Sequence, residues 1–331
     1  MPKISTHTDP AAIAQLDGPP SASTLERGAV ARQAPDLHLA ASGADSGCTA
    51  RCSLWWTDTP AYAEERVGLV GHYAAADPAA GRAVLDRACR RLAHEGCTCA
   101  IGPMDGATWY PYRFVTDWGR RPPFALEPWH PPGYPDQFRA AGFEPLARYV
   151  SSVGADADTL AQTAPPDAPP RDDVRVRSLD LDRFGEELRH LHPLVTTSFA
   201  DNFLYTPLPE ADFVALHRPY RSLIEPGLVR LLEQERADGP RLVGVGFMVP
   251  DAAQAERGEP VDSAVLKTLA VHPDVRGQGL GRWLTEHMHA RAGRRGYEQV
   301  LHALMHEDNV SRNLGHGPPI RRYTLYRRAL S

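Results

Sequence analysis

A glycine-rich loop between an apolar strand and an amphipathic helix is the feature that most constrains the fold. Residues 263–271 (SAVLKTLAV) predict a buried strand, and residues 280–295 predict a helix with one apolar stripe that stops at Gly296. The loop between them contains Gly277, Gly279 and Gly281. Glycines allow close backbone approach, and the first N–H groups of a helix have no internal partner. The pattern therefore predicts an anion site suited to a phosphate or pyrophosphate. The loop is neither a Walker loop nor a dinucleotide-binding fingerprint, since it lacks both spacings.

Strands and helices alternate in both halves of the chain. In the second half, apolar patterns predict strands at 174–178, 227–232, 242–249, 263–271, 300–305 and 323–330, and helices at 181–191 and 280–295. The first half repeats the central part of this order, with strands at 66–72 and 97–102 around a helix at 80–94. Three residue types recur in the same register: Gly81 and Gly281, Arg82 and Arg282, and Gly96 and Gly296. This predicts an α/β protein with a mixed sheet, built from a duplicated unit.

A proline- and aspartate-rich segment separates the two halves. Residues 154–173 (GADADTLAQTAPPDAPPRDD) carry almost no bulky apolar side chains and are typical of a linker. We therefore predict an N-terminal domain at 1–153 and a C-terminal domain at 174–331. Residues 1–23 also lack a periodic apolar signal, and we expect the start of the chain to be frayed.

Composition limits the partners and the compartment. The 331 residues carry a net charge of −5, which disfavours a strongly electrostatic nucleic-acid binder. The sequence shows neither an apolar run long enough to cross a membrane nor a secretory signal, so we expect a soluble, cytoplasmic protein. All of the 36 basic residues except Lys3 and Lys267 are arginine, which indicates coding bias. The five cysteines (Cys48, Cys52, Cys89, Cys97, Cys99) fit no zinc spacing, so we expect small buried residues and no metal.

The glycine loop lies in a longer recognisable pattern. Residues 266–284 (LKTLAVHPDVRGQGLGRWL) closely resemble motif A of the GNAT acyltransferase superfamily, whose pyrophosphate loop is written [RQ]-x-x-G-x-[GA]. The strand that follows and residues 306–311 (HEDNVS) resemble motif B. The N-terminal half resembles a second, degenerate copy, and residues 140–151 resemble a GNAT C-terminal strand pair. The resemblance therefore implies two GNAT-like domains in tandem.

The resemblance also implies acyl transfer from acetyl-CoA or another acyl-CoA to an amine. Backbone N–H groups of residues 277–282 would hold the pyrophosphate, and the strand end would hydrogen-bond the pantetheine arm. The implied CoA-binding residues are Leu269, Ala270, Val271, Arg276, Gly277, Gln278, Gly279, Leu280, Gly281, Arg282 and Asn309. In the N-terminal half the corresponding residues 72–81 contain a single glycine and Asp77, which would repel phosphate. We expect this half to bind no CoA and to act as a scaffold or substrate wall.

Two departures from the family pattern leave the catalytic groups open. Many GNAT enzymes place a glutamate on the motif-A strand as proton acceptor, but residues 264–266 contain no carboxylate. Many place a tyrosine five residues after the motif-B asparagine, where this chain has Leu314. A histidine is the best substitute, since its pKa lies near working pH. The candidates are His302, His306, Glu307, His316 and Tyr323.

The acceptor is less well defined. Residues 196–209 occupy the place of the first GNAT helices, and Asp201, Asn202 and Tyr205 are candidates for binding a polar amine. Residues 109–138 are rich in aromatic residues and prolines. They fit a rigid loop over the N-terminal core, which we favour, or the wall of an acceptor pocket.

The leading hypothesis is a CoA-dependent N-acyltransferase that acts on a small or amino-acid-like amine by direct attack in a ternary complex. One alternative keeps the fold but takes its donor from a carrier protein or an aminoacyl-tRNA. The acidic net charge disfavours tRNA. Another alternative is a non-catalytic acyl-CoA-binding module, which the missing glutamate and tyrosine would suit. The acyl chain, the acceptor and the oligomeric state stay open.

Overall fold

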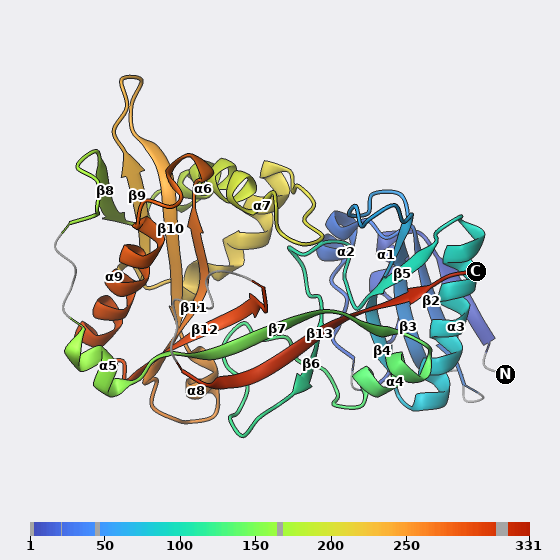
Figure 1. The fold of residues 1–331 in the computed structure, drawn as a ribbon. Coiled ribbons are helices and arrows are strands. Elements are labelled where there is room, and N and C mark those ends of the chain that lie inside the picture. The colour runs from blue at the N-terminus through green and yellow to red at the C-terminus, as the bar shows by residue number, and fades with distance from the viewer. Residues whose placement is uncertain (1–2, 21, 44–46, 164–167, 309–316) are drawn as a thin grey trace.

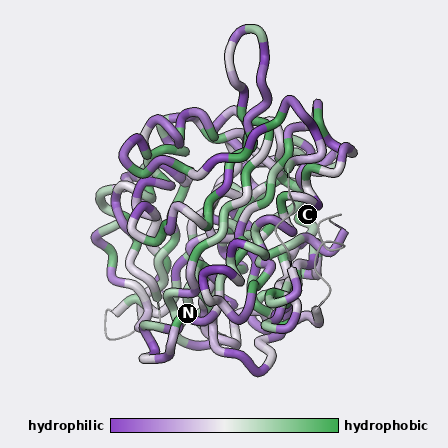
Figure 2. Tube along the Cα trace, turned by 90° about the vertical axis from the view of Figure 1, so that its left-hand side faces the viewer, coloured by the Kyte–Doolittle hydropathy of each residue, from purple (hydrophilic) through white to green (hydrophobic). Residues whose placement is uncertain are grey.

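A computed structural model describes residues 3–20, 22–43, 47–163, 168–308 and 317–331. The described residues form one mixed sheet of 13 strands with helices on its faces (Figure 1). Twelve strands follow the order β1-β2-β3-β4-β5-β13-β7-β12-β11-β10-β9-β8, and β6 pairs with β13 beside this path. Apolar residues line the strands inside the molecule, while the tip between β9 and β10 is polar and projects from the body (Figure 2). The architecture confirms the predicted mixed α/β fold.

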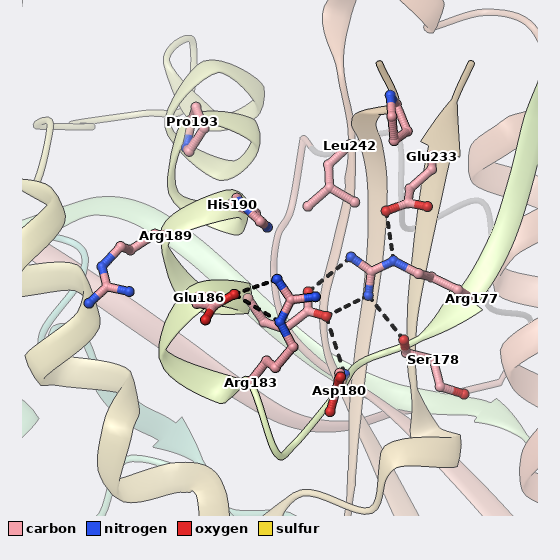
Figure 3. A pocket seen from close by; sticks show the side chains of 12 residues that line it. Arg177, Ser178, Asp180, Arg183, Glu186, Arg189, His190, Pro193, Glu233 and Leu242 are labelled. Carbon is pink, nitrogen blue, oxygen red and sulfur yellow. Dashed lines mark hydrogen bonds and ion pairs between the residues drawn. The ribbon is translucent and has the colours of Figure 1, made fainter. Parts of the chain in front are cut away.

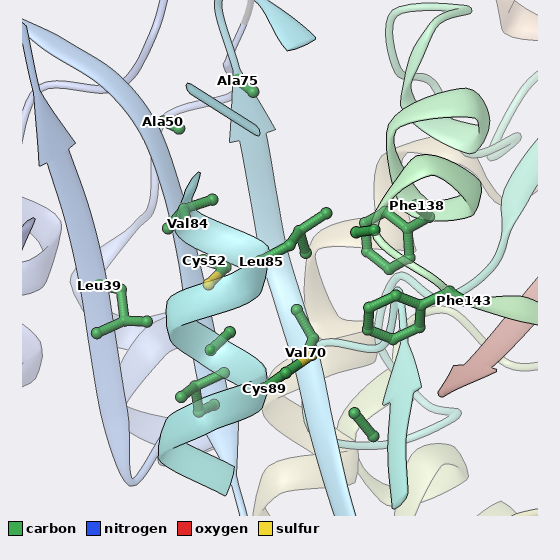
Figure 4. Close-up of a cluster of buried hydrophobic side chains, with 14 of the residues drawn as sticks. Leu39, Ala50, Cys52, Val70, Ala75, Val84, Leu85, Cys89, Phe138 and Phe143 are labelled. Atoms are coloured by element: carbon green, nitrogen blue, oxygen red, sulfur yellow. The ribbon is translucent and has the colours of Figure 1, made fainter. Parts of the chain in front are cut away.

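The N-terminal half packs one long helix against its sheet. The strands are β1 (Lys3–His7), β2 (Leu37–Ser42), β3 (Cys48–Trp55), β4 (Val67–Ala75), β5 (Cys99–Gly102) and β6 (Phe114–Asp117). The helices are α1 (Pro10–Ala14), α2 (Arg27–Gln33), α3 (Pro78–His94) and α4 (Tyr134–Ala140). The apolar stripe of α3, with Val84 and Leu85, packs on Leu39 and Val70 of the sheet (Figure 4). Cys52, Cys89, Cys97 and Cys99 are buried, as expected from the sequence, and all five cysteines are free thiols.

The C-terminal half repeats this arrangement. Its strands are β8 (Val174–Ser178), β9 (Val229–Gln234), β10 (Arg241–Pro250), β11 (Ser263–Val271) and β12 (Gln299–His306). Its helices are α6 (Phe184–Phe199), α7 (Glu210–His217), α8 (Ala252–Glu256) and α9 (Leu280–Arg294), with short 3-10 turns at η1 (Arg218–Leu223), η2 (Pro226–Leu228) and η3 (Pro273–Val275). The helix α9 packs on one face of β10 and β11, and α6 and α7 pack on the other face. The predicted strands at 174–178 and 263–271 match the structure at both ends.

The two halves exchange their closing strands. Strand β7 (Glu144–Ala155) pairs antiparallel with β12 of the C-terminal half, with His302 opposite Ser152. Strand β13 (Pro319–Ala329) pairs antiparallel with β5 of the N-terminal half, with Ala329 opposite Cys99. The two exchanged strands also pair with each other and run side by side through the middle of the molecule (Figure 1). Residues 1–153 and 174–331 therefore do not form separately closed sheets.

Two segments are more ordered than the sequence predicts. The predicted linker at 154–173 begins with the end of β7 and continues into α5 (Ala157–Gln162). Helix α5 buries Leu160 against α9, so this part of the segment does contribute to a core. Residues 3–7 are also paired rather than frayed, because β1 forms an antiparallel ladder with β2 from Lys3 opposite Ser42 to His7 opposite His38. Strand pairing fixes β1 and the end of β7, and burial of Leu160 fixes α5, without the periodic apolar signal that the prediction required.

A buried ion pair joins the N-terminal loop after β6 to the exchanged strand β13. The carboxylate of Glu127 accepts two hydrogen bonds from the Arg321 guanidinium, at 2.7 Å and 3.1 Å, and neither side chain has any exposed surface. Arg321 also donates to the carbonyl oxygens of Arg121 and Pro122. The pair is therefore fully hydrogen-bonded, which a buried charge requires.

We predict that Arg321→Met destabilises the protein far more than Arg322→Met does. The first change leaves the Glu127 charge buried without its partner, which costs about 3–5 kcal/mol. The second removes an exposed pair with Glu307, 50% and 29% accessible, which is worth less than about 1 kcal/mol. Urea unfolding of both variants measures the difference. Equal losses would show that the buried pair does not hold the halves together.

Protonation of His130 should destabilise the folded state in acid. Its Nε2 accepts a hydrogen bond from the Val115 N–H at 2.7 Å, and its Nδ1 donates to the Pro131 carbonyl. Burial lowers the pKa of His130 from 6.5 to about 4. Between pH 6.5 and 4 the unfolded chain therefore binds a proton on His130, whereas the folded chain does not. The free energy of unfolding should fall between pH 6.5 and 4 by up to about 1.4 kcal/mol per pH unit.

The control for this pH dependence is His130→Gln, whose side chain can still accept the Val115 hydrogen bond but does not titrate. Urea unfolding at a series of pH values should give a shallower slope for this variant below pH 6.5. His38, whose pKa burial lowers to about 3, should supply part of the slope that is left. An unchanged slope would contradict the prediction.

Candidate functional site

Strands β11 and β12 separate to form a fork. They pair in parallel from Ser263 opposite Gln299 to Leu266 opposite His302, and the ladder stops there. Beyond that point β11 keeps its pairing with β10 as far as Val271. Solvent exposure begins at the same level, since 263–266 and 300–303 are buried whereas 267–269 and 304–306 are half-buried. The two strands therefore diverge past Leu266 and His302, and we call the region between their ends the notch.

Both strands are irregular where the notch begins. In the β10–β11 ladder Phe247 pairs with Thr268 and Met248 with Leu266, so Lys267 is an extra, unpaired residue. In β12 the pairing with β7 shifts between His302 and Met305, and Leu304 has a φ of 61°. A bulge of this kind bends a strand and redirects its side chains. The two bulges lie at the same level and mark the closed end of the notch.

The glycine loop lies beyond the open end of the notch, at the start of α9. Gly277 and Gly279 have φ values of 74° and 81°, a conformation that other residues rarely adopt. Gly279 is the N-cap of α9, and no side chain caps the helix. A Cβ atom at Gly281 would meet only Val271 Cγ2, at 3.8 Å. Free N–H groups beside open space at a helix start fit a pyrophosphate.

Two arginines hold this loop in place. The Arg276 guanidinium donates to the carbonyl oxygen of Val271 at 3.1 Å and to that of Ser198, so it ties the loop to β11 and α6. The Arg171 guanidinium donates to Gln278 from the end of the predicted linker. Arg276 thus has a structural role besides any contact with a phosphate.

The equivalent fork in the N-terminal half is closed. Strands β4 and β5 pair in parallel only from Val67 to Leu69, but the chain after β5 turns back onto β4. The Met104 N–H donates to the Val70 carbonyl at 2.9 Å, and the His72 N–H donates to the Asp105 carboxylate at 2.6 Å. These contacts fill the space that stays open in the C-terminal half.

The helix start in the N-terminal half is also occupied. The Asp77 carboxylate accepts hydrogen bonds from the N–H groups of Ala79 and Ala80, both at 2.9 Å. A Cβ atom at Gly81 would lie 2.3 Å from the Tyr73 hydroxyl oxygen, whereas the space at Gly281 is free. The chain itself supplies the anion here, so this helix has no free N–H groups for a phosphate.

The side chains of two candidate catalytic residues are buried and already hydrogen-bonded. His302 is buried beneath α9, where its Nε2 lies 2.9 Å from Nε2 of His289, while its neighbours Leu301 and Ala303 pack on the opposite face. Tyr323 is completely buried, and its hydroxyl donates to Glu127 at 2.6 Å. Burial and the Glu127 charge raise the pKa of Tyr323. Tyr323 is therefore unsuited to protonating a leaving thiolate in this arrangement, which corrects the sequence-based expectation.

The other candidates lie near the outer end of β12. His306 is the last residue of the strand and packs against the Tyr149 and Phe203 rings, with centroids 4.9 Å and 5.9 Å away. Glu307 forms an ion pair with Arg322 at 3.3 Å. His316 and Asn309 lie outside the described residues. His306 is thus the histidine candidate that the structure places beside the notch.

The loop after α6 connects the notch to the N-terminal half. Asp201 and Asn202 are exposed, while Tyr205 is half-buried against the Trp109 ring, with centroids 5.9 Å apart. The Trp109 indole N–H also donates to the Thr206 carbonyl at 2.9 Å. Residues 109–138 are therefore more than a cover for the N-terminal core, because they also contact the C-terminal half.

Three charged groups at the closed end of the notch were not predicted as site residues. The ammonium of Lys267 donates to the Leu126 carbonyl at 2.9 Å. Arg113 donates to the Leu304 carbonyl at 3.4 Å, with its guanidinium 4.0 Å from the Tyr112 ring centroid. Glu127, which is paired with Arg321, is the third charged group. Lys267 lies directly after the stretch in which the family glutamate was missing, which is the one sequence signal that pointed here.

A separate pocket of about 510 Å³ lies between β8, α6 and the β9–β10 pair (Figure 3). Several of its charges are paired with one another, Arg177 with Glu187 and Glu233, and Arg183 with Glu186. None of its lining residues belongs to β11, β12 or the glycine loop. Because the pocket includes neither the strand fork nor the glycine loop, we place the functional site at the notch.

Among the described residues, no cluster of three or more His, Cys, Asp or Glu side chains has the arrangement of a metal site. None of the helices in that part of the chain has the length and apolar character needed to cross a bilayer.

Comparison with known proteins identifies the class of this domain. Residues 233–328 match the family model of the acetyltransferase (GNAT) domain, and they contain β11, the glycine loop, α9 and β12. No curated protein sequence matches the chain significantly. The C-terminal half therefore carries a GNAT acetyltransferase domain, and members of this family use acetyl-CoA or another acyl-CoA.

Solved structures extend the likeness to the whole chain. A GCN5-related N-acetyltransferase from Sphaerobacter thermophilus is 13% identical, covers 88% of this chain and 80% of its own, and gives a TM-score of 0.50. A tandem GNAT protein from the clavulanic acid biosynthesis pathway is 13% identical, with 99% and 98% covered and a TM-score of 0.51. A probable N-acyltransferase from Enterococcus faecalis is 8% identical, with 100% and 73% covered and a TM-score of 0.52. The chain has the tandem GNAT fold.

Proposed function

We propose that this protein is a CoA-dependent N-acyltransferase, of the general class EC 2.3.1, that uses one acyl-CoA site in its C-terminal half. The contrast between the two forks carries the proposal. One fork is open and ends at an uncapped helix, while the other is filled by Met104 and ends at a helix capped by Asp77. Both arise from the same strand–helix–strand unit, so the open fork is a feature of one copy and not of the fold as such.

The open fork suggests how an acyl-CoA would bind. The N–H groups of residues 277–282, at the start of α9, would bind the pyrophosphate, with Arg282 exposed beside them. Leu269, Ala270 and Val271, past the end of the β12 pairing, would offer backbone groups to the pantetheine arm. The thioester would then lie near Lys267 and Leu304 at the closed end of the notch. An amine held beside it could attack directly, since proximity replaces a bimolecular encounter.

The N-terminal half would shape the acceptor side of the site without binding CoA. Its Arg113 and Leu126 contact the C-terminal half at the closed end of the notch, and its Trp109 holds the loop after α6. Asp201, Asn202 and Tyr205 lie on that loop and would contact a polar, small or amino-acid-like amine. Acetyl-CoA is the simplest donor. A carrier-protein or aminoacyl-tRNA donor, and a non-catalytic CoA-binding role, are the alternatives.

Replacing Gly281 tests the donor site without disturbing the backbone. The Cβ position of Gly281 is open and its φ is not positive, so Gly281→Glu should fold at least as well as the wild type. The new carboxylate would repel the pyrophosphate. We expect acetyl-CoA at 100 times its dissociation constant to stabilise the wild type by about 2.7 kcal/mol, and the variant not at all. Thermal unfolding with acetyl-CoA and longer acyl-CoAs measures both.

Gly281→Ala is the matched control, since it adds only the Cβ and should keep the response to acetyl-CoA. Calorimetric titration should give one CoA per chain in the wild type. A residual site in Gly281→Glu would place CoA in the N-terminal half. If no CoA ester shifts the wild type, the acyl-CoA proposal fails and a carrier-protein or tRNA donor becomes the better hypothesis. Saturable binding without turnover of any amine would favour the non-catalytic alternative.

A further inference from the structure

We propose that Lys267 carries the proton during acyl transfer, taking it from the acceptor nitrogen and delivering it to the sulfur of CoA. This inference rests on the proposed acyl-CoA function and assigns the group that the sequence pattern leaves missing. It concerns the closed end of the notch, where the two strand bulges meet.

Lys267 lies at the closed end of the notch. It is the first residue of β11 past the last pair with β12, and it is the unpaired residue of the β10–β11 bulge. It is also where β11 turns from buried to half-buried, although the ammonium itself is buried against the loop that contains Leu126. A lysine here lies at the end of the notch, where the thioester of a bound acyl-CoA would be.

The Lys267 side chain points away from α9. Leu266 packs beneath α9, whereas Val265 packs on the opposite face with Phe124. The Lys267 ammonium donates to the carbonyl of Leu126, which packs against that same second cluster. The amine therefore extends to the face away from α9, between the fork and the loop of the N-terminal half that would border the acceptor.

Two charged groups, Arg113 and Glu127, act on the Lys267 amine in opposite directions. Burial, together with the positive charge of Arg113, lowers the pKa of Lys267 to about 7, and Glu127 acts in the opposite direction. The Glu127 charge is shared with Arg321, and its carboxylate also accepts from Tyr323. Near neutral pH the amine therefore exists in both its neutral and its charged form, as a group that takes and returns a proton must.

The neighbouring candidates are less suited to this step. Glu127 has no exposed surface, and its oxygens are occupied by Arg321 and Tyr323, so it cannot reach an acceptor amine. His306 remains partly exposed, but its ring packs against Tyr149 and its Nδ1 accepts from the Asp308 N–H at 3.1 Å. Lys267 combines a position at the closed end of the notch with a pKa of about 7.

The proposed step balances without any further reactant. The neutral acceptor amine attacks the thioester carbon, so that a C–N bond forms and the C–S bond breaks. The neutral Lys267 amine takes the proton that the acceptor nitrogen must lose. The resulting ammonium gives this proton to the departing thiolate. The products are the amide and CoA with a free thiol, and Lys267 returns to its neutral form.

The presence of only two lysines makes a direct test possible. Protein labelled with lysine carrying 13C at Cε should give two NMR signals, from Lys267 and from the exposed Lys3, which Lys3→Arg assigns. We expect the Lys267 signal to titrate with a midpoint near 7. Added CoA should move the Lys267 signal, because its thiol would lie beside the amine, and should leave Lys3 in place. Arg113→Gln should raise the midpoint, since it removes a neighbouring positive charge.

The outcomes separate this inference from the proposed function. If CoA raises the melting temperature but leaves the Lys267 signal unmoved, or if Lys267 titrates above about pH 9, the inference is overturned and the donor site stands. If CoA does not raise the melting temperature, the proposed function itself fails and the inference with it.

Activity gives a second, independent readout, with glycine, ethylamine and glucosamine as probe amines. Lys267→Met and Lys267→Arg should lower kcat by about 10²–10⁴-fold and abolish the pH dependence near 7, while the KM for acetyl-CoA stays unchanged. His306→Gln is the matched control and should keep that pH dependence. Wild-type turnover by Lys267→Arg, which cannot release its proton, would refute the role of Lys267.

Discussion

The pairing between β7 and β13 is the constraint on which the rest of the structure depends. Each strand comes from one half of the chain and completes the sheet of the other, so the ladder between them makes the two sheets continuous. The buried pair of Glu127 and Arg321 strengthens the same junction. Because β7 lies directly beside β12, this junction also supports the bulge at Leu304 and hence the closed end of the notch. The notch and the junction between the two halves therefore depend on the same strand pairing.

Local patterns predicted the elements around the notch better than they predicted how strands pair across the chain. The strand at 263–271, the glycine loop and the helix at 280 follow from apolar periodicity and glycine placement, which act over a few residues. The exchange of β7 and β13 could not be read in this way, because strand pairing across the whole chain leaves no local signal. The sequence pattern did not predict a role for Lys267, for a related reason. Its role depends on a bulge and on Leu126, which comes from the other half.

The two halves show how one unit acquires or loses a ligand site through few contacts. In the N-terminal copy a single carboxylate, Asp77, accepts hydrogen bonds from the N–H groups at the start of α3, and Met104 and Asp105 after β5 fill the fork. Among the described residues of the C-terminal copy, none takes the same places. The closed fork is well packed and can serve as scaffold, whereas the open fork leaves backbone groups unpaired. A ligand that binds there would supply the missing partners.

The strand exchange also bears on how the chain folds. Cys99 of β5 pairs with Ala329 of β13, so the N-terminal sheet gains its next strand only after almost the entire sequence printed here has been synthesised. Contacts so distant in sequence are slow to form, because the entropy of closing a long loop is lost before the contacts can stabilise the fold. During synthesis the edge of β5 stays unpaired and can bind other strands. The emerging N-terminal half should therefore be the part of this protein that most depends on chaperones.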